Sequence, residues 1–329
     1  MAGRLSRVQG AILTLALCLA APFAARAASL YTVTVASADL GVVTSAVAGD
    51  TDFRIDPTAG AVTIVSGQAT RSANSSTRAM VTVACAAQVA GDCTHNVNVR
   101  LTAAGSPAGR ARALTRLTFV MGTAQLAGSP GPPGQAAFTI APVGPNASVT
   151  FFVGGDFAIA GDDSGLSTGV AEADFTAAVS ETTPTGGGTG RFVATVIRSI
   201  SVSKTSDLVF GSVQRPVSGA GSVTIDAVTG ARTLTNANGL PTPVPARATF
   251  SIAGEGGQAF TVTVPSSFTM NGPQPLTVTT SSSSASPVLS GSLGSQGSFV
   301  FGVGATVPLS STTPTGDYSG SFTVTVAYN

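Results

Sequence analysis

The chain holds few side chains that can do acid–base chemistry. His95 is the single histidine among 329 residues, and no nucleophilic serine or cysteine with an acidic partner stands in a recognisable motif. A catalytic triad needs all three groups. We therefore predict that the protein is not an enzyme, that it has no cofactor, and that His95 lies on the surface.

Acidic side chains gather at Asp156, Asp162 and Asp163, around the turn-forming stretch 161–165. Carboxylate oxygens are the ligands that calcium prefers, but the stretch lacks the spacing and the bidentate glutamate of an EF-hand loop. We predict a polar loop without a metal and keep a calcium site as the alternative. An enzyme with an unrecognised site would need a deep pocket around Asp156 or Asp162.

The first residues follow the pattern of an export signal. Arg4 and Arg7 precede an apolar run at 11–21, and the small-x-small triplet Ala25–Ala27 follows it. We predict a signal peptide over residues 1–27, with cleavage after Ala27. No later stretch is apolar for long enough to span a bilayer as a helix, so we predict no integral membrane span.

Two cysteines, Cys85 and Cys93, follow this leader. In an oxidising compartment two nearby thiols form a disulfide more often than they bind a metal, and only His95 lies near them as a further ligand. We predict a structural disulfide across the tip of a hairpin.

One cassette occurs twice in the chain. Residues 182–186 and 312–316 both have the sequence TTPTG, and Phe192 matches Phe322 at the same offset of 130. A repeat of this length indicates a duplicated domain.

Further matches keep the same order along the chain. Residues 150–159 align with 300–309, and 52–60 align with 222–230. Because the offset shrinks along the chain, the first copy must carry an insertion near 160–180. We predict two homologous domains, 28–196 and 197–329.

Within each copy, side-chain type alternates with period two. The clearest segments are 29–36, 96–102, 148–153, 259–264 and 321–328. Turns rich in glycine and proline separate them, without helical stretches between. We predict an all-β protein of two tandem Ig-like antiparallel β-sandwiches.

The composition also bears on possible partners. Charged residues make up 9% of the chain, and the formal net charge is +1. A chain this weakly charged has no long-range field that would attract nucleic acid. We predict no nucleic-acid partner.

The last predicted strand has one apolar face. Phe322, Val324, Val326 and Tyr328 alternate with small or hydroxylated residues. An uncovered edge with an apolar face promotes aggregation unless another strand pairs with it. That strand comes either from this chain or from another chain.

This end of the chain resembles subunits of chaperone–usher fimbriae. Such subunits end in alternating apolar residues, with a penultimate tyrosine and a glycine fourteen positions from the end. Tyr328 and Gly316 hold these positions here. The resemblance implies an incomplete sandwich that a periplasmic chaperone fills first and an N-terminal strand of another subunit fills later.

The segment 29–36 has the alternation that such a donor strand would need, through Leu30, Thr32 and Thr34. The simpler interpretation, which we favour, is that this segment is the first strand of the first domain. The single disulfide position and the two tandem domains depart from the fimbrial pattern.

A second resemblance covers the second domain and, more loosely, the first. The segments Leu208–Gly211, Val223–Asp226 and Gly316–Tyr328 are similar to the secreted bacterial family named domain of unknown function 4402. The family implies an exported β-sandwich related to pilins, with no established activity.

Together these patterns predict an exported structural or adhesive protein in the periplasm, at the cell surface or outside a Gram-negative bacterium. Its expected partners are further copies of itself or other surface subunits, joined by β-strand complementation, and a periplasmic chaperone. The alternative is a two-domain tip adhesin whose first domain binds a glycan.

Overall fold

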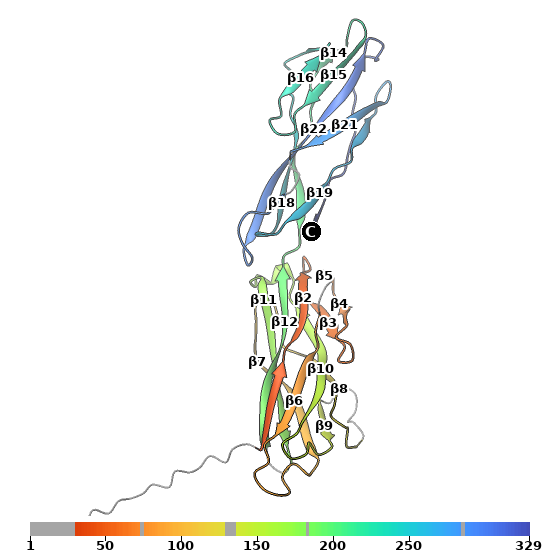
Figure 1. The fold of residues 1–329 in the computed structure, drawn as a ribbon. Coiled ribbons are helices and arrows are strands. Elements are labelled where there is room, and N and C mark those ends of the chain that lie inside the picture. The colour runs from red at the N-terminus through yellow and green to blue at the C-terminus, as the bar shows by residue number, and fades with distance from the viewer. Residues whose placement is uncertain (1–29, 73–75, 129–135, 182–183, 284–286) are drawn as a thin grey trace, which may run out of the picture.

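The computed structural model describes residues 30–72, 76–128, 136–181, 184–283 and 287–329. The predicted signal peptide lies outside these residues. Within them almost every regular element is a strand, with one short 3₁₀ turn, η1 (Asp162–Ser164), so the all-β prediction is confirmed. Figure 1 shows two elongated β-domains placed end to end, the first built from β1–β12 and the second from β13–β23. No helix in the described part of the chain is long and apolar enough to cross a membrane.

The first domain is a sandwich of two sheets. One sheet has the order β1-β6-β10-β3-β4, and β8 also pairs with β10. Its strands are β1 (Tyr31–Ala36), β6 (Ala79–Cys85), β10 (Ser148–Ile159), β3 (Thr51–Ile55), β4 (Val62–Ser66) and β8 (Arg116–Met121). The other sheet has the order β5-β2-β12-β11-β7-β9. Its strands are β5 (Thr70–Ser72), β2 (Ala38–Thr44), β12 (Pro184–Ile197), β11 (Gly169–Ser180), β7 (Val97–Ala108) and β9 (Ala137–Ile140).

Alternation along the strands builds the core of the first domain. In β6, Val81 and Val83 are fully buried while Met80, directly before Val81, is exposed, as period-two side chains require. Phe175 and Phe192, from neighbouring strands, meet edge to face with ring centroids 5.7 Å apart. Burying each large apolar side chain stabilises the fold by about 1.5–3 kcal/mol.

One pair of strands departs from the antiparallel prediction. After β1 the chain passes from one sheet to the other at Ser37, and β2 then pairs in parallel with β12, with Phe192 opposite Ala38 and Val196 opposite Val43. Leu40 of β2 is fully buried. The first domain therefore covers the outer edge of its own last strand with its own N-terminal segment.

The predicted insertion contains more than a polar loop. It includes η1 and β11, and β11 pairs with β12 on one side and β7 on the other. Residues 169–180 therefore form a central strand, because their alternation of alanine, phenylalanine and polar residues suits a strand buried on one face.

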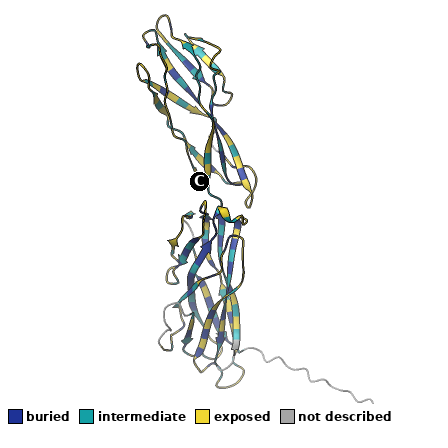
Figure 2. Ribbon diagram, turned by 180° about the vertical axis from the view of Figure 1, so that it is seen from behind, coloured by how far each residue is buried: buried dark blue, intermediate teal, exposed yellow. Residues whose placement is uncertain are grey.

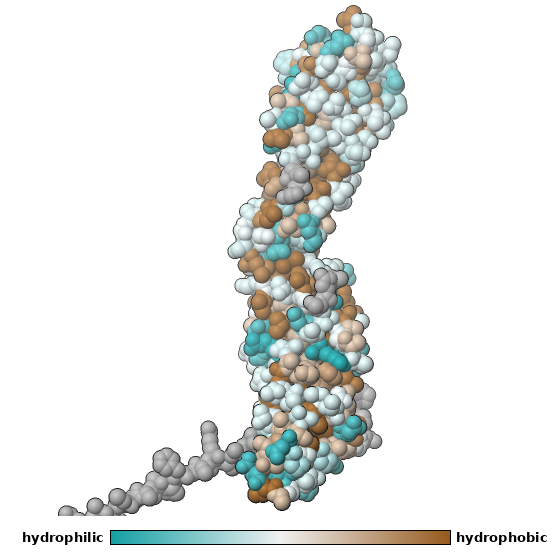
Figure 3. Space-filling model, in the orientation of Figure 1, coloured by the Kyte–Doolittle hydropathy of each residue, from teal (hydrophilic) through white to brown (hydrophobic). Residues whose placement is uncertain are grey.

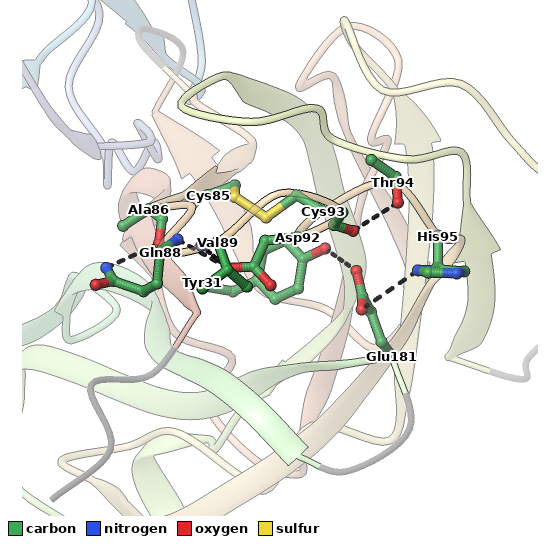
Figure 4. The surroundings of a disulfide bond; sticks show 11 residues. Tyr31, Cys85, Ala86, Gln88, Val89, Asp92, Cys93, Thr94, His95 and Glu181 are labelled. Atoms are coloured by element: carbon green, nitrogen blue, oxygen red, sulfur yellow. Dashed lines mark hydrogen bonds and ion pairs between the residues drawn. A yellow bond between two sulfur atoms is a disulfide. The ribbon is translucent and has the colours of Figure 1, made fainter.

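The disulfide between Cys85 and Cys93 is present, but the prediction of a hairpin tip is wrong. Cys85 ends β6, and the following strand, β7, belongs to the opposite sheet. The loop therefore crosses between sheets, since consecutive strands do not always pair. Figure 4 shows Asp92 inside this loop, where the backbone N–H groups of Val89 and Gln88 donate to its carboxylate and hold its pKa below the usual range.

The second domain has one large sheet and two small pairs of strands. The large sheet has the order β13-β18-β22-β15-β16, with β21 pairing with both β22 and β20. Its strands are β13 (Ser201–Ser206), β18 (Ala248–Glu255), β22 (Gln296–Ser310), β15 (Ala220–Ile225), β16 (Arg232–Thr235), β20 (Ser267–Met270) and β21 (Leu276–Ser282). The small pairs are β14 (Val213–Gln214) with β17 (Asn238–Gly239), and β19 (Phe260–Thr263) with β23 (Thr325–Tyr328).

The second domain is less well buried than the first. Figure 2 shows long dark-blue stretches along the strands of the first domain and more teal and yellow along those of the second. Its buried apolar residues form two separate small clusters, one around Phe250, Phe260 and Phe301 and one around Val278 and Val307. The second domain therefore has less apolar burial to stabilise it.

Each domain contains the same kind of turn, stabilised by the same kind of side-chain contacts. Asp56 and Asp226 each accept hydrogen bonds from backbone N–H groups two or three residues ahead, which is the geometry of an Asx turn. An arginine side chain then donates to a carbonyl of each turn, Arg78 to Pro57 and Arg247 to Ala227.

A glycine on the neighbouring strand passes close beneath each turn. A Cβ at Gly154 would overlap the carbonyl oxygen of Ile55, and a Cβ at Gly304 would overlap that of Ile225. Only glycine allows the backbones to approach this closely.

Replacing Gly154 by alanine should therefore destabilise the first domain by about 1–3 kcal/mol, because the new methyl group must push the turn outward. Gly187→Ala is the matched control: it lies in a strand of the same domain, and its Cβ would meet nothing closer than 3.6 Å. Urea unfolding of both variants measures the difference. Equal midpoints for the two would contradict the close approach.

Candidate functional site

The last strand of the second domain presents one half-buried apolar face. Phe322, Val324, Val326 and Tyr328 pack against the cluster that contains Phe250, and each stays partly exposed. The residues between them are exposed. Upstream, Gly316 has a φ of +151°, and a Cβ there would come within 2.6 Å of Cγ of Pro273.

β23 has a partner on one edge only. It pairs antiparallel with β19, with Val262 opposite Val326 and Phe260 opposite Tyr328, and no other strand in the described part of the chain pairs with it. The N–H of Asn329 donates to Ala259, whereas the N–H of Phe260 donates away from β23, to Pro287.

These bonds define which groups of β23 face outward. Hydrogen-bonded and non-hydrogen-bonded pairs alternate along an antiparallel ladder. Since the pair containing Asn329 is hydrogen-bonded, the backbone N–H and C=O groups of Val326 and Tyr328 point away from β19. Among the residues that the structure describes, none accepts a hydrogen bond from either N–H, so β23 has a free edge.

The corresponding strand of the first domain has no such edge. β12 pairs with β11 on one side and with β2 on the other. By the offset of 130, Val196 corresponds to Val326, and Val196 lies opposite Val43 of β2. The two domains therefore differ in whether their last strand is covered.

The edge strand β13 borders the same apolar cluster as β23. Ile200 and Val202 pack against the cluster that Val324 and Val326 also contact. β13 carries Lys204, the one lysine of the chain, whose ammonium group is 2.6 Å from a carboxylate oxygen of Asp207. A charged lysine on an edge strand discourages further pairing there.

The end of β23 also lies at the junction between the domains. Figure 1 shows the C-terminus beside the point where the second domain meets the first. The hydroxyl of Tyr328 donates to the carbonyl of Arg198 at 2.9 Å and accepts from the N–H of Glu255 at 2.7 Å. Burial raises the pKa of Tyr328 above its usual range, so its hydroxyl stays protonated as a donor.

Glu255 is completely buried at this junction. Its carboxylate accepts from the hydroxyl of Thr168 at 2.9 Å, from the N–H of Gly294 at 2.5 Å and from the N–H of Arg198 at 3.1 Å. The guanidinium of Arg198 lies 3.6 Å away. A buried carboxylate requires such donors, because its desolvation is otherwise costly.

A second carboxylate, Asp162, holds the connection from the side of the first domain. It accepts from the backbone and the side chain of Ser199, from Arg110 and from Ser45. Arg110 is 1% exposed. Burial acts to raise the pKa of Asp162, but the hydrogen bonds from Ser199, Arg110 and Ser45 outweigh it and hold the pKa below its usual range.

The three acidic residues considered for calcium have separate partners. Asp156 pairs with Arg54 at 2.7 Å, Asp162 lies at the junction, and Asp163 accepts from the N–H of Gly49. Within the described ranges no group of three or more metal-binding side chains comes together.

The remaining predicted site residues lie at the far end of the first domain or in β1. His95 is largely exposed and 4.0 Å from Glu181, which also accepts from the hydroxyl of Tyr31 at 2.5 Å (Figure 4). Thr32 and Thr34 lie in β1, which pairs with β6 as an edge strand of the first domain.

Two hollows lie on the first domain. One, of about 560 Å³, lies between β7 and the start of β8, and the other, of about 590 Å³, lies beside β9. Neither is lined by histidine or by a carboxylate, and neither includes Asp156 or Asp162.

The junction residues were not predicted from the sequence. One signal was available, since Glu255 is the one acidic residue between Asp226 and Asp317. An isolated acid at the end of an apolar strand is a candidate for a buried, hydrogen-bonded carboxylate.

Comparison with known families identifies the second domain. Residues 200–328 match the model of the family described as Domain of unknown function (DUF4402), so this part of the chain is a DUF4402 domain. The match does not include the first domain, and its status as a second copy stays a prediction. No curated protein matches the chain.

Two of the solved structures that resemble this chain show how weak the likeness is. One belongs to the structure titled "Chaperone-tip adhesin complex is vital for synergistic activation of CFA/I fimbriae biogenesis", at 9% identity over 89% of this chain and 96% of that chain, with a TM-score of 0.27. The other is the CsuC–CsuE chaperone–tip adhesion subunit pre-assembly complex of archaic chaperone–usher Csu pili from Acinetobacter baumannii. It is 12% identical over 90% of this chain and 99% of that chain, with a TM-score of 0.25.

The lowered pKa of Asp162 gives a pH dependence with a definite sign. The carboxylate contributes stability above its ordinary value of 3.8, and this contribution is lost as pH falls through the lower folded value. Asp162→Asn should therefore be less stable than the unmodified chain at pH 7, and this difference should shrink towards pH 2.

Thermal unfolding of both proteins from pH 7 to pH 2 measures this difference, and subtracting one from the other removes the contributions of other acidic groups. A difference that stays constant over this range would show that Asp162 is not ionised in the junction.

Proposed function

We propose that the protein is an exported structural or adhesive surface subunit whose second domain accepts a β-strand from a partner chain along the free edge of β23. The observation that carries this proposal is the contrast between the two last strands. β12 is covered on both edges, by β11 and β2, whereas among the described strands β23 is covered by β19 alone.

The chemistry of this edge defines the partner. The outward N–H and C=O groups of Val326 and Tyr328 can pair with any extended backbone. Selectivity would come from side chains that reach the cluster between Ile200, Val202 and Val324, which is apolar and uncharged. The partner is therefore an extended segment with alternating apolar residues and no charge on its inward face.

The surface agrees with this role. Figure 3 shows scattered brown apolar patches near the junction and over the second domain, on a surface that is otherwise mostly of intermediate hydropathy. Val300 of β22 is 66% exposed. Added strands bury such apolar surface, and their backbone hydrogen bonds supply affinity.

β1 could act as the donor strand only if it left its own sheet. It pairs with β6 along its whole length, and Tyr31 and Val33 are buried in the first domain. We therefore favour a donor strand from another kind of chain. A second copy of this chain and a periplasmic chaperone are the other proposed partners.

The proposal that the first domain is a diverged copy of the second rests on shared geometry. The Asx turns at Asp56 and Asp226, the supporting arginines and the glycines beneath them recur in both. In this proposal the first domain kept the fold and gained β11 within the insertion, with β2 covering its last strand.

Glycan binding by the first domain is a second candidate. The hollow beside β9 is lined by Asn98, Arg100, Thr139 and Ser180, whose side chains can donate hydrogen bonds to sugar hydroxyls. Arg100 also lines the neighbouring hollow. Binding of the isolated full chain to a glycan array, lost in Arg100→Ala, tests this candidate.

Strand acceptance is tested by blocking the outward amide of β23. Val326→Pro removes the N–H that faces the free edge and leaves the hydrogen-bonded pairs to β19 in place. We expect this variant to fold and to lose binding of a synthetic peptide with the sequence of residues 29–36, which has the required alternation.

The matched control is Val326→Thr, which keeps the amide and the β-branched shape and should bind the same peptide. Fluorescence anisotropy of the labelled peptide measures binding, and a peptide N-methylated on alternate amides should not bind. Equal binding by Val326→Pro and Val326→Thr, or binding of the N-methylated peptide, would overturn strand acceptance at this edge.

A further inference from the structure

The connection between the two domains is short and held from both sides. β12 ends at Ile197 and β13 begins at Ser201, so three residues join the domains. Asp162 of the first domain holds Ser199, and Glu255 of the second domain holds Arg198. Domains joined by a short linker move relative to each other by default unless their interface prevents it.

One hydrogen bond passes directly from one domain to the other. The hydroxyl of Thr168, just before β11, donates to Glu255 at the end of β18. Thr168 is 7% exposed and Glu255 is not exposed at all. The carboxylate therefore has donors from the first domain, from the linker and, through Gly294, from the second domain.

The last strand completes this arrangement. The hydroxyl of Tyr328 joins the N–H of Glu255 to the carbonyl of Arg198, so it connects β18 to the linker. Tyr328 can occupy this position only when β23 is paired with β19, because their register places it opposite Phe260.

We propose that these groups form a lock, in which the docked last strand, through Tyr328, and the buried carboxylate of Glu255 hold the two domains in one relative orientation. The lock closes as a unit, because the donors of Glu255 come from three parts of the chain. If the domains separate, the carboxylate of Glu255 loses the hydrogen bond from Thr168, and if the linker moves, it loses the one from the N–H of Arg198. If β23 leaves β19, the carbonyl of Arg198 in the linker loses its hydrogen bond from the hydroxyl of Tyr328.

The lock goes beyond the proposed strand acceptance and does not depend on it. In the lock, the side chain of Tyr328 acts at the junction, whereas strand acceptance uses the outward backbone groups of β23. Strand binding can fail while the lock holds, and the lock can fail while strand binding persists, so the two experiments are independent.

Distances between the domains test the lock in the full chain. Spin labels on Thr63→Cys in β4 and Thr233→Cys in β16, both exposed positions, report the separation by pulsed electron resonance. Cys18 is replaced by serine, and the disulfide between Cys85 and Cys93 is kept oxidised. The unmodified junction should give one narrow distance distribution.

Tyr328→Phe keeps the ring in the apolar cluster and removes the hydroxyl. We expect the distribution to broaden, with the ratio of undocked to docked molecules rising by roughly fivefold, as for one lost neutral hydrogen bond. Tyr318→Phe is the matched control. It also removes a tyrosine hydroxyl from the C-terminal segment, but that hydroxyl donates to the carbonyl of Pro314, away from the junction. It should leave the distribution unchanged.

Thr168→Val tests the lock from the side of the first domain, without any change in the second domain or in β23. It too should broaden the distribution, and its melting temperature shows whether both domains stay folded. A broad distribution in the unmodified chain would overturn the lock. So would a narrow distribution in both Tyr328→Phe and Thr168→Val, or equal broadening in Tyr318→Phe.

Discussion

Backbone N–H and C=O groups need partners along both edges of a strand, and the structure of this protein depends on how each domain meets that requirement for its last strand. In the first domain, the chain crosses from one sheet to the other after β1, and β2 then pairs with the outer edge of β12. In the second domain, no strand of the described residues pairs with the corresponding edge of β23. The same strand type is therefore internal in one domain and exposed in the other.

The open edge has consequences for the packing beneath it. Phe322, Val324 and Val326 stay half-buried, and the buried residues of the second domain form two small clusters instead of one large core. In the first domain a single cluster extends between the sheets, because β2 and β11 supply further apolar side chains. An added strand would therefore supply to the second domain both hydrogen bonds and apolar burial.

The junction shows how buried charges hold a specific geometry. Two carboxylates, Glu255 and Asp162, would be unfavourable in a protein interior without donors. Each has at least three, and the donors include two of the three residues of the linker, Arg198 and Ser199. Since Tyr328 belongs to the strand with the free edge, the junction and that edge share one structural element.

The sequence by itself determined the class of fold and the apolar face of the last strand. Period-two alternation, turn residues at short intervals and the chemistry of two nearby cysteines are local properties, and they predict strands, turns and a disulfide wherever the chain folds. The alternation of Phe322, Val324 and Val326 likewise predicted which side chains of the final segment pack together.

Only the tertiary structure decided which strand edges have partners and which polar residues are buried. The parallel pairing of β2 with β12, the crossing of the Cys85–Cys93 loop between sheets and the burial of Glu255 all depend on residues far apart in the sequence. Alternation places a side chain on a face of a strand but says nothing about which backbone lies beside it, because hydrogen-bonding groups are the same at every residue. For that reason the free edge of β23 and the contacts of Tyr328 became visible only once the whole chain was folded.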